Sequence, residues 1–305
     1  MLLLSLAAGL ALLILGGELL LRGAVALSLR LGLSPLFIGL TVVGFGTSTP
    51  ELFTSLQATF SGAPDIALGN VIGSNIANAL LILGAAALMA PMAVRRAALY
   101  RDGIAVMLAT LACTGLALTG SFTPLSGVLL LAGLAAYLLL AWKTESAEAP
   151  EPLPQALPPL AALALTAGGI ALTLLGARFL VSGAVELATT LGVSEAVIGL
   201  TIVAVGTSLP ELVTSIMAAR KGQPELALGN VLGSNIYNIL GILGATALLS
   251  PAPLDASAMV PDALAMLAAT TLMLVLATTG WRITRTEGGL LLAPYAAYLI
   301  WLIPA

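Results

Sequence analysis

The sequence predicts an all-α integral membrane protein with ten transmembrane helices in two inverted five-helix repeats. Of its 305 residues, 59% are hydrophobic and only 8% are charged, and the mean hydropathy is +1.10, whereas about a quarter of a soluble domain is charged. Its apolar runs reach the length of about 20 residues that a helix needs to cross a bilayer. The runs are continuous, which argues against a β-barrel, whose strands alternate over about ten residues.

A duplicated stretch divides the chain into two copies. Residues 41–84 read TVVGFGTSTPELFTSLQATFSGAPDIALGNVIGSNIANALLILG, and residues 201–244 repeat them without a gap as TIVAVGTSLPELVTSIMAARKGQPELALGNVLGSNIYNILGILG, 160 positions later. With five helices in each copy, the second copy must enter the membrane from the opposite side. The sequence therefore predicts an inverted-topology repeat.

Prolines and glycines mark the joints of the first copy. Its apolar N-terminal run ends near Gly32, the second run ends before SGAP at 61–64, and the third ends before Pro91. The sequence TGSFTP separates the last two runs. The expected helices of this copy cover residues 1–32, 34–60, 65–89, 97–119 and 124–142.

A polar segment separates the copies. Residues 143–158 contain KTESAEAPEPLPQALP, a composition typical of an exposed linker. We therefore expect a first repeat at 1–142, a linker at 143–158 and a second repeat at 159–305. The expected helices of the second copy run to about residue 190 and then cover 194–219, 225–249, 258–279 and 288–303.

Basic residues fall at alternate joints. They occur after the first, third, fifth, seventh and ninth expected helices, and none occurs at the other four joints. By the positive-inside rule these joints are cytoplasmic, which places the multi-pass chain in the inner membrane with both termini outside. The joint residues are Arg30, Arg95, Arg96, Arg101, Lys143, Arg220, Lys221, Arg282 and Arg285.

Two arginines, Arg22 and Arg178, lie inside expected helices instead. Arg22 follows Glu18 by four residues, a spacing at which opposite charges meet on one helix face. We expect an ion pair there rather than a transport role.

Each copy places one carboxylate in the middle of an apolar run. Glu51 follows Thr47 and Ser48 by four and three residues, and the same spacings precede Glu211. These positions share one helical face. Because a charge in lipid is costly, an ionisable residue there marks a functional site.

Prolines break the helix next to both glutamates. Pro50 has no N–H to donate to the carbonyl of Gly46, and Pro210 has the same relation to Gly206. Carbonyls without partners are tolerated at membrane depth where they line a cavity or meet an ion. We expect the Gly46 carbonyl to lose its helical partner.

The next helix of each copy carries polar side chains at four-residue steps. The whole inventory is oxygen-rich: the chain has no histidine, and its single Cys113 is expected to be buried and inert. Such ligands suit hard cations, Ca²⁺ best and Na⁺ next. The stripes are Asn70, Ser74 and Asn78 in the first copy and Asn230, Ser234 and Asn238 in the second.

These motifs are similar to a known family. GTSTPEL and GTSLPEL, followed by ALGNVIGSNIAN and ALGNVLGSNIYN, resemble the two α-repeats of the calcium/cation antiporter superfamily, in particular prokaryotic sodium/calcium exchangers. The resemblance implies exchange of three Na⁺ for one Ca²⁺, with the long first and sixth helices moving against the core. It also departs at Asn238, where some archaeal relatives have an aspartate.

The resemblance also implies roles for individual residues. The implied Ca²⁺ ligands are Glu51, Glu211, Thr47 and Thr207. The implied Na⁺ ligands are Ser48, Ser74, Ser208, Ser234 and the main-chain carbonyls of Gly44 and Ala204, with Asn78 and Asn238 completing the middle.

The function expected from these observations is a secondary antiporter that exchanges Na⁺ for Ca²⁺. The alternative is a proton-coupled Ca²⁺ antiporter, because a buried glutamate can carry a proton. An enzyme is disfavoured, since histidine-dependent hydrolysis is impossible and no aspartyl pair is indicated; a passive channel is the third reading. The expected partners are Ca²⁺, Na⁺ and the lipid bilayer, without a cofactor or nucleic acid, and the expected state is a monomer.

Overall fold

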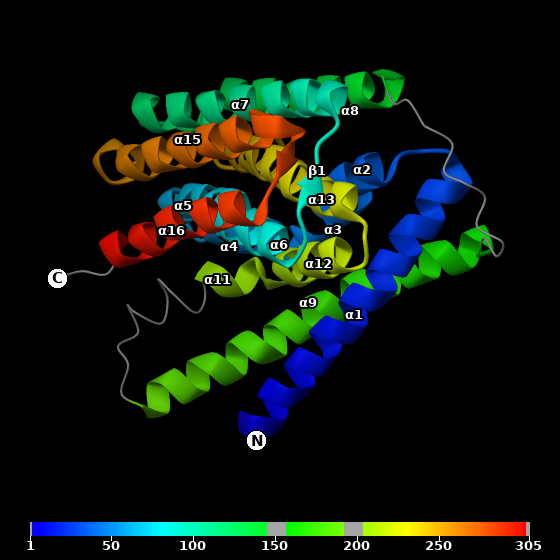
Figure 1. Ribbon diagram of the computed structural model, residues 1–305. Helices are drawn as coiled ribbons and strands as arrows, with labels where there is room; N and C mark the ends of the chain where they lie inside the picture. Colours follow the sequence, from blue (N-terminus) through cyan, green and yellow to red (C-terminus); the bar gives the residue numbers. More distant parts are fainter. Residues whose placement is uncertain (1, 145–156, 192–203, 303–305) are drawn as a thin grey trace.

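The computed structural model describes residues 2–144, 157–191 and 204–302. Most of the expected linker 143–158 and residues 194–203 of the expected helix 194–219 lie outside these residues. The described chain is almost wholly helical, as Figure 1 shows. The predicted all-α membrane class is therefore confirmed.

The first copy contains the expected helices, two of them divided into shorter segments. The second and third expected helices each contain a π-helical segment, named η1 and η2. The elements are α1 (Leu2–Leu31), α2 (Pro35–Ile38), η1 (Gly39–Val43), α3 (Gly44–Thr47), α4 (Thr49–Phe60), α5 (Pro64–Ile76), η2 (Ala77–Ile82), α6 (Leu83–Met89), α7 (Arg96–Thr119) and α8 (Pro124–Thr144).

The second copy repeats this order. Its π-helical segment, η4, begins 160 positions after η2. The elements are α9 (Pro159–Thr190), α11 (Ala204–Thr207), α12 (Leu209–Arg220), α13 (Pro224–Ile236), η4 (Tyr237–Leu243), α14 (Gly244–Leu249), α15 (Ala256–Thr278), the 3₁₀ turn η5 (Thr279–Trp281) and α16 (Arg285–Leu302).

Within the described ranges, seven helical segments are long and apolar enough to cross a membrane. The α2–α3 segment and α4 form an eighth if they count as one span, bent by 45°. The protein is thus a multi-span membrane protein. The expected total of ten spans stays a prediction.

The two long helices α1 and α9 pack against each other and cross obliquely beneath the remaining helices in Figure 1. Glycines at seven-residue spacing let their backbones touch: a Cβ on Gly9 would lie 2.6 Å from Leu180 N, and one on Gly16 would lie 2.6 Å from Thr173 N. Small residues at such interfaces permit close helix packing in membranes. The contacts run in opposite directions along the two helices, so the pair is antiparallel.

A second close contact lies at the centre of the bundle, where α13 packs against α2 and η1. A Cβ on Gly229 would lie 2.3 Å from Leu36 O, and one on Gly233 would lie 2.1 Å from Leu40 O. Gly229 and Gly233 thus allow the close approach of α13 to α2 and η1. The approach brings Ser234 beside Gly44.

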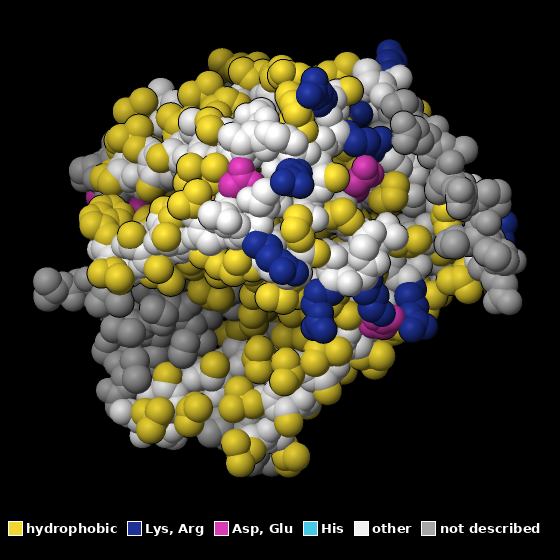
Figure 2. Space-filling view, in the orientation of Figure 1, with side chains coloured by type: hydrophobic (Ala, Val, Ile, Leu, Met, Phe, Trp, Pro, Cys, Tyr) yellow, Lys and Arg dark blue, Asp and Glu magenta, His cyan; other side chains and the backbone are white. Residues whose placement is uncertain are grey.

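The loops at the ends of the helices also meet in pairs. β1 (Met92–Ala93) and β2 (Arg282–Ile283) form a two-residue antiparallel ladder that pairs Met92 with Ile283. Figure 2 shows Lys and Arg side chains gathered on the right of the molecule, where the loops and helix ends lie, and apolar side chains over much of the rest. This distribution matches one basic face and a lipid-facing body.

Candidate ion-binding site

The bend between α3 and α4 creates the local structure of the site. Ser48 has φ −78° and ψ 12°, between two helical segments, and Pro50 stands in the first turn of α4. The second copy repeats this at Ser208, with φ −89° and ψ 8°. Each break puts one glutamate, Glu51 or Glu211, in the first turn of the helix that follows.

The Gly46 carbonyl lacks its helical partner, because Pro50 has no N–H. It is not left unpaired, since the Thr49 hydroxyl donates to it at 2.7 Å. A side chain next to the proline thus replaces the missing backbone donor. In the second copy, Leu209 stands at the equivalent position and has no hydroxyl.

Each glutamate is held by the serine of the opposite copy. The Ser48 hydroxyl donates to Glu211 Oε1 at 3.0 Å, and the Ser208 hydroxyl donates to Glu51 Oε1 at 3.2 Å. Both glutamates are about 1% exposed. The two halves of the duplication therefore build one polar centre rather than two.

The other oxygen of each carboxylate is free. Neither Glu51 Oε2 nor Glu211 Oε2 has a hydrogen-bond partner among the described residues, and the same holds for Asn78 Oδ1 and Asn238 Oδ1. A buried oxygen without a donor is costly. Four such atoms in symmetric pairs indicate a place for a positive charge.

The expected threonines lie against the carboxylates. Thr47 is next to Glu211, and Thr207 is next to Glu51. The Thr47 hydroxyl also lies 3.0 Å from Val43 O and 3.1 Å from Asn230 Oδ1. Thr47 thus links the break in its own copy to α13 of the other copy.

The structure gives the positions of the other residues expected to bind Na⁺. The Ser234 hydroxyl donates to Gly44 O at 3.2 Å, which joins two of the residues expected as Na⁺ ligands. Ser74 is buried in α5, and Ala204 begins α11, so its carbonyl lies at the start of the segment before the break.

Asn70 and Asn230 were expected only as part of a stripe, whereas Asn78 and Asn238 were also expected in the middle of the site. Asn70 Nδ2 donates to Glu51 O at 3.2 Å, and Asn230 Nδ2 donates to Glu211 O at 3.3 Å. They hold the backbone of the glutamates. Asn78 and Asn238 instead belong to η2 and η4, and π-helical turns occur often at functional sites.

Asn75 and Asn235 were missed in the sequence. Asn78 Nδ2 donates to Asn235 Oδ1 at 2.9 Å, and Asn238 Nδ2 donates to Asn75 Oδ1 at 3.2 Å. The repeated GSN triplet was the available signal, because it places a second buried asparagine at the same point of both copies.

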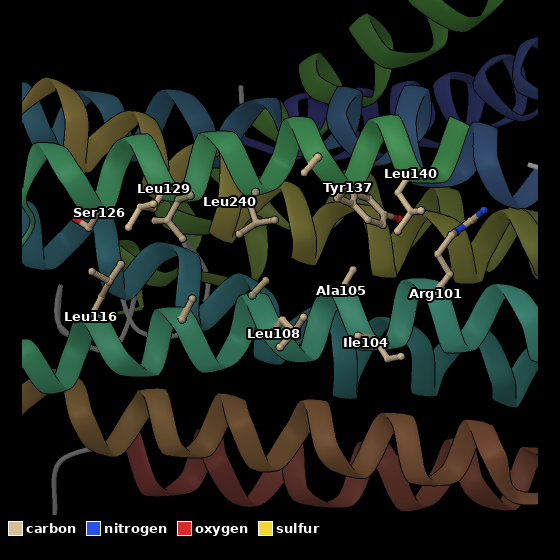
Figure 3. Close-up of a pocket in the computed structure, with 15 residues that line it drawn as sticks. Arg101, Ile104, Ala105, Leu108, Leu116, Ser126, Leu129, Tyr137, Leu140 and Leu240 are labelled. Carbon is tan, nitrogen blue, oxygen red and sulfur yellow. The ribbon is translucent and has the colours of Figure 1, made fainter. Parts of the chain in front are cut away.

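An apolar pocket lies outside the polar centre. A cavity of about 490 Å³ runs between α7 and α8, with Leu240 at its base; its walls are almost entirely apolar, with Arg101 at one end and Ser126 near the other (Figure 3). Such a lining cannot replace the water around a cation. The pocket is a groove between helices and is unrelated to the polar centre.

Among the described residues, no three of His, Cys, Asp and Glu form a metal-binding group. The centre offers instead two carboxylates, amide oxygens, hydroxyls and main-chain carbonyls, which are ligands for hard cations. A many-span helical bundle with such a centre between two copies of one motif is typical of a secondary cation transporter.

Residues 1–143 and 161–303 match the family model described as sodium/calcium exchanger protein, so the chain belongs to this family. It is 33% identical over 337 residues to the sodium/calcium exchanger MaX1 of Methanosarcina acetivorans, covering 96% of this chain and 95% of that one. It is 36% identical over 308 residues to the inner membrane protein YrbG of Escherichia coli, covering 96% and 93%.

The fold is similar to a solved exchanger. The sodium-calcium exchanger NCX_Mj, soaked with zero Na⁺ and Ca²⁺, superposes with a TM-score of 0.85 at 33% identity, covering 99% of this chain and 100% of that one. The family is one of transporters, and the chain is a membrane antiporter of the calcium/cation class.

Proposed function

We propose that the protein exchanges Na⁺ for Ca²⁺ across the inner membrane, at one site between the two copies. The observation that carries this proposal is the set of four buried oxygens without partners, Glu51 Oε2, Glu211 Oε2, Asn78 Oδ1 and Asn238 Oδ1. Two carboxylates and two amide oxygens match the charge and the ligand type that Ca²⁺ prefers. No cofactor is required, since the ions are the substrates.

The proposed ligands are those that the family resemblance implies. Ca²⁺ takes the two carboxylates of Glu51 and Glu211 with oxygens of Thr47 and Thr207. Asn78 and Asn238 complete the middle. Na⁺ takes the flanking oxygens, which are those of Ser48, Ser74, Ser208 and Ser234 and the carbonyls of Gly44 and Ala204. The contact between Ser234 and Gly44 at 3.2 Å supports this pairing of hydroxyl and carbonyl.

Competition between the ions gives exchange. Two negative charges in a poorly screened centre neutralise one Ca²⁺ or a set of Na⁺, but adding both would bring cations together at high Coulomb cost. One ion species must therefore leave before the other binds. A single shared centre couples the two fluxes without a second site.

The architecture that this mechanism needs is ten spans in two inverted repeats, 1–142 and 159–305, joined by a cytoplasmic linker at 143–158. The crossed bonds Ser48 to Glu211 and Ser208 to Glu51 support a two-fold relation in the membrane plane. The basic joints support termini outside. We propose a monomer, because one chain supplies both halves of the centre.

Alternating access is proposed to come from α1 and α9 moving as a pair. In support, α1 covers α12: a Cβ on Gly17 would lie 2.6 Å from Met217 Sδ and 3.1 Å from Val213 Cγ1. Phe53, the counterpart of Val213 on α4, is 67% exposed. The pair thus covers α12 at this position but not the equivalent position of α4, an asymmetry expected for one of two access states.

Na⁺ coupling is favoured over H⁺ coupling by the serine hydroxyls around the centre, which are neutral oxygen ligands of the kind that Na⁺ uses. The deciding experiment is Ca²⁺ uptake into proteoliposomes loaded with Na⁺, with K⁺ or choline as replacements and with a pH gradient as the alternative drive. Uptake only with internal Na⁺ supports the proposal. Uptake driven equally by the pH gradient alone would establish the proton-coupled alternative.

A further inference from the structure

Four amide side chains form a closed arrangement between α5–η2 and α13–η4. Asn75 Nδ2 donates to Asn235 O and Asn235 Nδ2 donates to Asn75 O, both at 3.4 Å. Asn78 and Asn238 then donate to the Oδ1 atoms of Asn235 and Asn75, at 2.9 and 3.2 Å. We call these four residues the amide ring; each is at most about 1% exposed.

The ring fixes which way each amide points. A backbone carbonyl only accepts, so the bonds to Asn235 O and Asn75 O require Nδ2 of Asn75 and Asn235 on that side. Their Oδ1 atoms must then face Asn238 and Asn78. Asn78 and Asn238 therefore turn Nδ2 toward Asn235 and Asn75. The Oδ1 atoms of Asn78 and Asn238 lie on the other side of each amide, without a hydrogen-bond partner among the described residues.

We propose that Asn75 and Asn235 are positioning residues that hold the carbonyl oxygens of Asn78 and Asn238 toward the transported cation. The inference rests on the proposed function, because it takes the unpartnered oxygens as cation ligands. An asparagine free to rotate would present its NH₂ group, which repels a cation, about as readily as its oxygen. The ring fixes the rotation of the amide before the cation binds. Binding free energy is therefore not lost in orienting the amide.

The symmetry of the amide ring supports a role in orienting Asn78 and Asn238. Each bond is made twice, once from each copy, and no member of the ring carries a charge that would compete with the glutamates. Asn75 and Asn235 lie near the ends of α5 and α13, and Asn78 and Asn238 follow three residues later in η2 and η4. The neutral residues Asn75 and Asn235 thus orient the neutral ligands Asn78 and Asn238. The charge of the centre still comes from Glu51 and Glu211.

The test uses the full-length protein with Asn75→Leu and Asn235→Leu, which keep the branched side-chain shape and remove every ring bond made by that side chain, while the main-chain carbonyl stays. The matched control is Thr110→Val. Thr110 Oγ1 and Thr270 Oγ1 lie 3.4 Å apart, also buried and 160 positions apart, outside the polar centre. If a leucine variant is not recovered folded, serine at the same position serves, because its hydroxyl falls short of the partner amide.

Two quantities are measured for each variant. One is the Ca²⁺ concentration for half-maximal Na⁺-driven flux in proteoliposomes, and the other is the rise in unfolding temperature of the detergent-solubilised protein with added Ca²⁺. Loss of a group that orients a metal ligand weakens metal affinity about 10- to 100-fold. We expect half-saturation to rise by that factor in both ring variants and to stay within about twofold in the control.

A purely structural role would lower the unfolding temperature without Ca²⁺ and leave half-saturation unchanged. That result in both ring variants would overturn the role of the ring and leave the exchanger proposal standing. Parent protein without Na⁺-driven Ca²⁺ flux would overturn the proposed function, and the role of the ring with it.

Discussion

The Ser48 hydroxyl donates to Glu211 Oε1 at 3.0 Å, although the two residues lie 163 positions apart and in opposite copies of the duplication. The reciprocal hydrogen bond runs from the Ser208 hydroxyl to Glu51 Oε1. Each carboxylate thus has one oxygen held by the other copy and one oxygen free. The held oxygen fixes the position, and the free oxygen is available to an ion.

This division of the two oxygens predicts the effect of neutral substitution. Glu51→Gln and Glu211→Gln keep an oxygen that accepts from the serine, so folding is retained. They remove one of two negative charges facing the cation. Loss of a residue that only orients a metal ligand lowers metal affinity or activity about 10- to 100-fold. Because Glu51 and Glu211 are proposed to bind the cation directly, we expect Na⁺-driven Ca²⁺ flux to fall by more than this factor.

The matched control for both variants is Glu225→Gln. Glu225 makes a partly exposed ion pair with Arg95 at 3.2 Å, outside the polar centre, and such pairs contribute about 0 to 1 kcal/mol to stability. Its flux should match that of the parent. Near-normal flux in either variant of Glu51 or Glu211 would contradict the proposed site.

Helix positions were predictable because apolar length and proline placement act locally. The expected helix 97–119 is observed at Arg96–Thr119, and 65–89 is observed from Pro64 to Met89. The bend at Ser48 was predictable from Pro50 for the same reason. The side-chain replacement at Gly46 was not, because Thr49 reaches the carbonyl only once the turn has formed.

The repeated GSN triplet could have drawn attention to Asn75 and Asn235, but the bonds of the amide ring could not be predicted from the sequence. A four-residue step selects Asn70, Ser74 and Asn78 as one face and passes over Asn75. The π-helical turn that starts at Ala77 widens the helix and changes which side chains share a face. Nothing in the residue pattern marks where that turn begins. The contacts between Asn75 and Asn235 also depend on the packing of the two copies, which periodicity within one helix does not contain.

The basic joints predict the orientation of the linker. Single cysteines at 143–157, introduced in a Cys113→Ser background, should be shielded from impermeant thiol reagents added to whole cells. Cysteines at 61–64 should be labelled, because that joint carries no basic residue and lies on the opposite side. Cys113 is buried, so its replacement by serine provides a silent background. The reverse labelling pattern would invert the topology.

The ion pairs of Glu18 predict that the protein favours one access state over the other. It pairs with Arg22 on its own helix at 2.6 Å, as the sequence indicated, and also with Lys221 at the end of α12. Partly exposed pairs contribute about 0.2 to 1 kcal/mol. Glu18→Gln should therefore shift the equilibrium about 1.4- to fivefold away from the state in which α1 covers α12. A cysteine at Val213, beneath Gly17, should react faster with thiol reagents by that factor.

The second copy supplies the comparison for this effect. The counterpart of Glu18 is Arg178, and the counterpart of Lys221 is Ser61, so the opposite-charge pair exists in one copy only. Arg22→Gln is the control, because it removes the contact within α1 and keeps the one to Lys221. Equal labelling of the Val213 cysteine in Glu18→Gln and Arg22→Gln would mean that the pair does not act on the position of α1.

The last prediction concerns Asn238 and the charge of the transported complex. With three Na⁺ exchanged for one Ca²⁺, as the family resemblance implies, the Na⁺-loaded centre carries one net positive charge and the Ca²⁺-loaded centre carries none. Na⁺-driven Ca²⁺ flux in liposomes should then respond to a clamped membrane potential. Flux that is indifferent to potential would rule out this stoichiometry.

Asn238→Asp tests the same centre by adding a charge. Asn238 Nδ2 donates to Asn75 Oδ1 at 3.2 Å; a carboxylate cannot donate there, so the substituted side chain loses this bond unless it takes up a proton. A third acidic group among buried, poorly screened charges also repels Glu51 and Glu211, which favours protonation in the centre. We expect flux to fall more steeply on acidification in the variant than in the parent, measured from pH 8 to about pH 5. Superimposable pH profiles would place Asn238 outside the electrostatic reach of the glutamates.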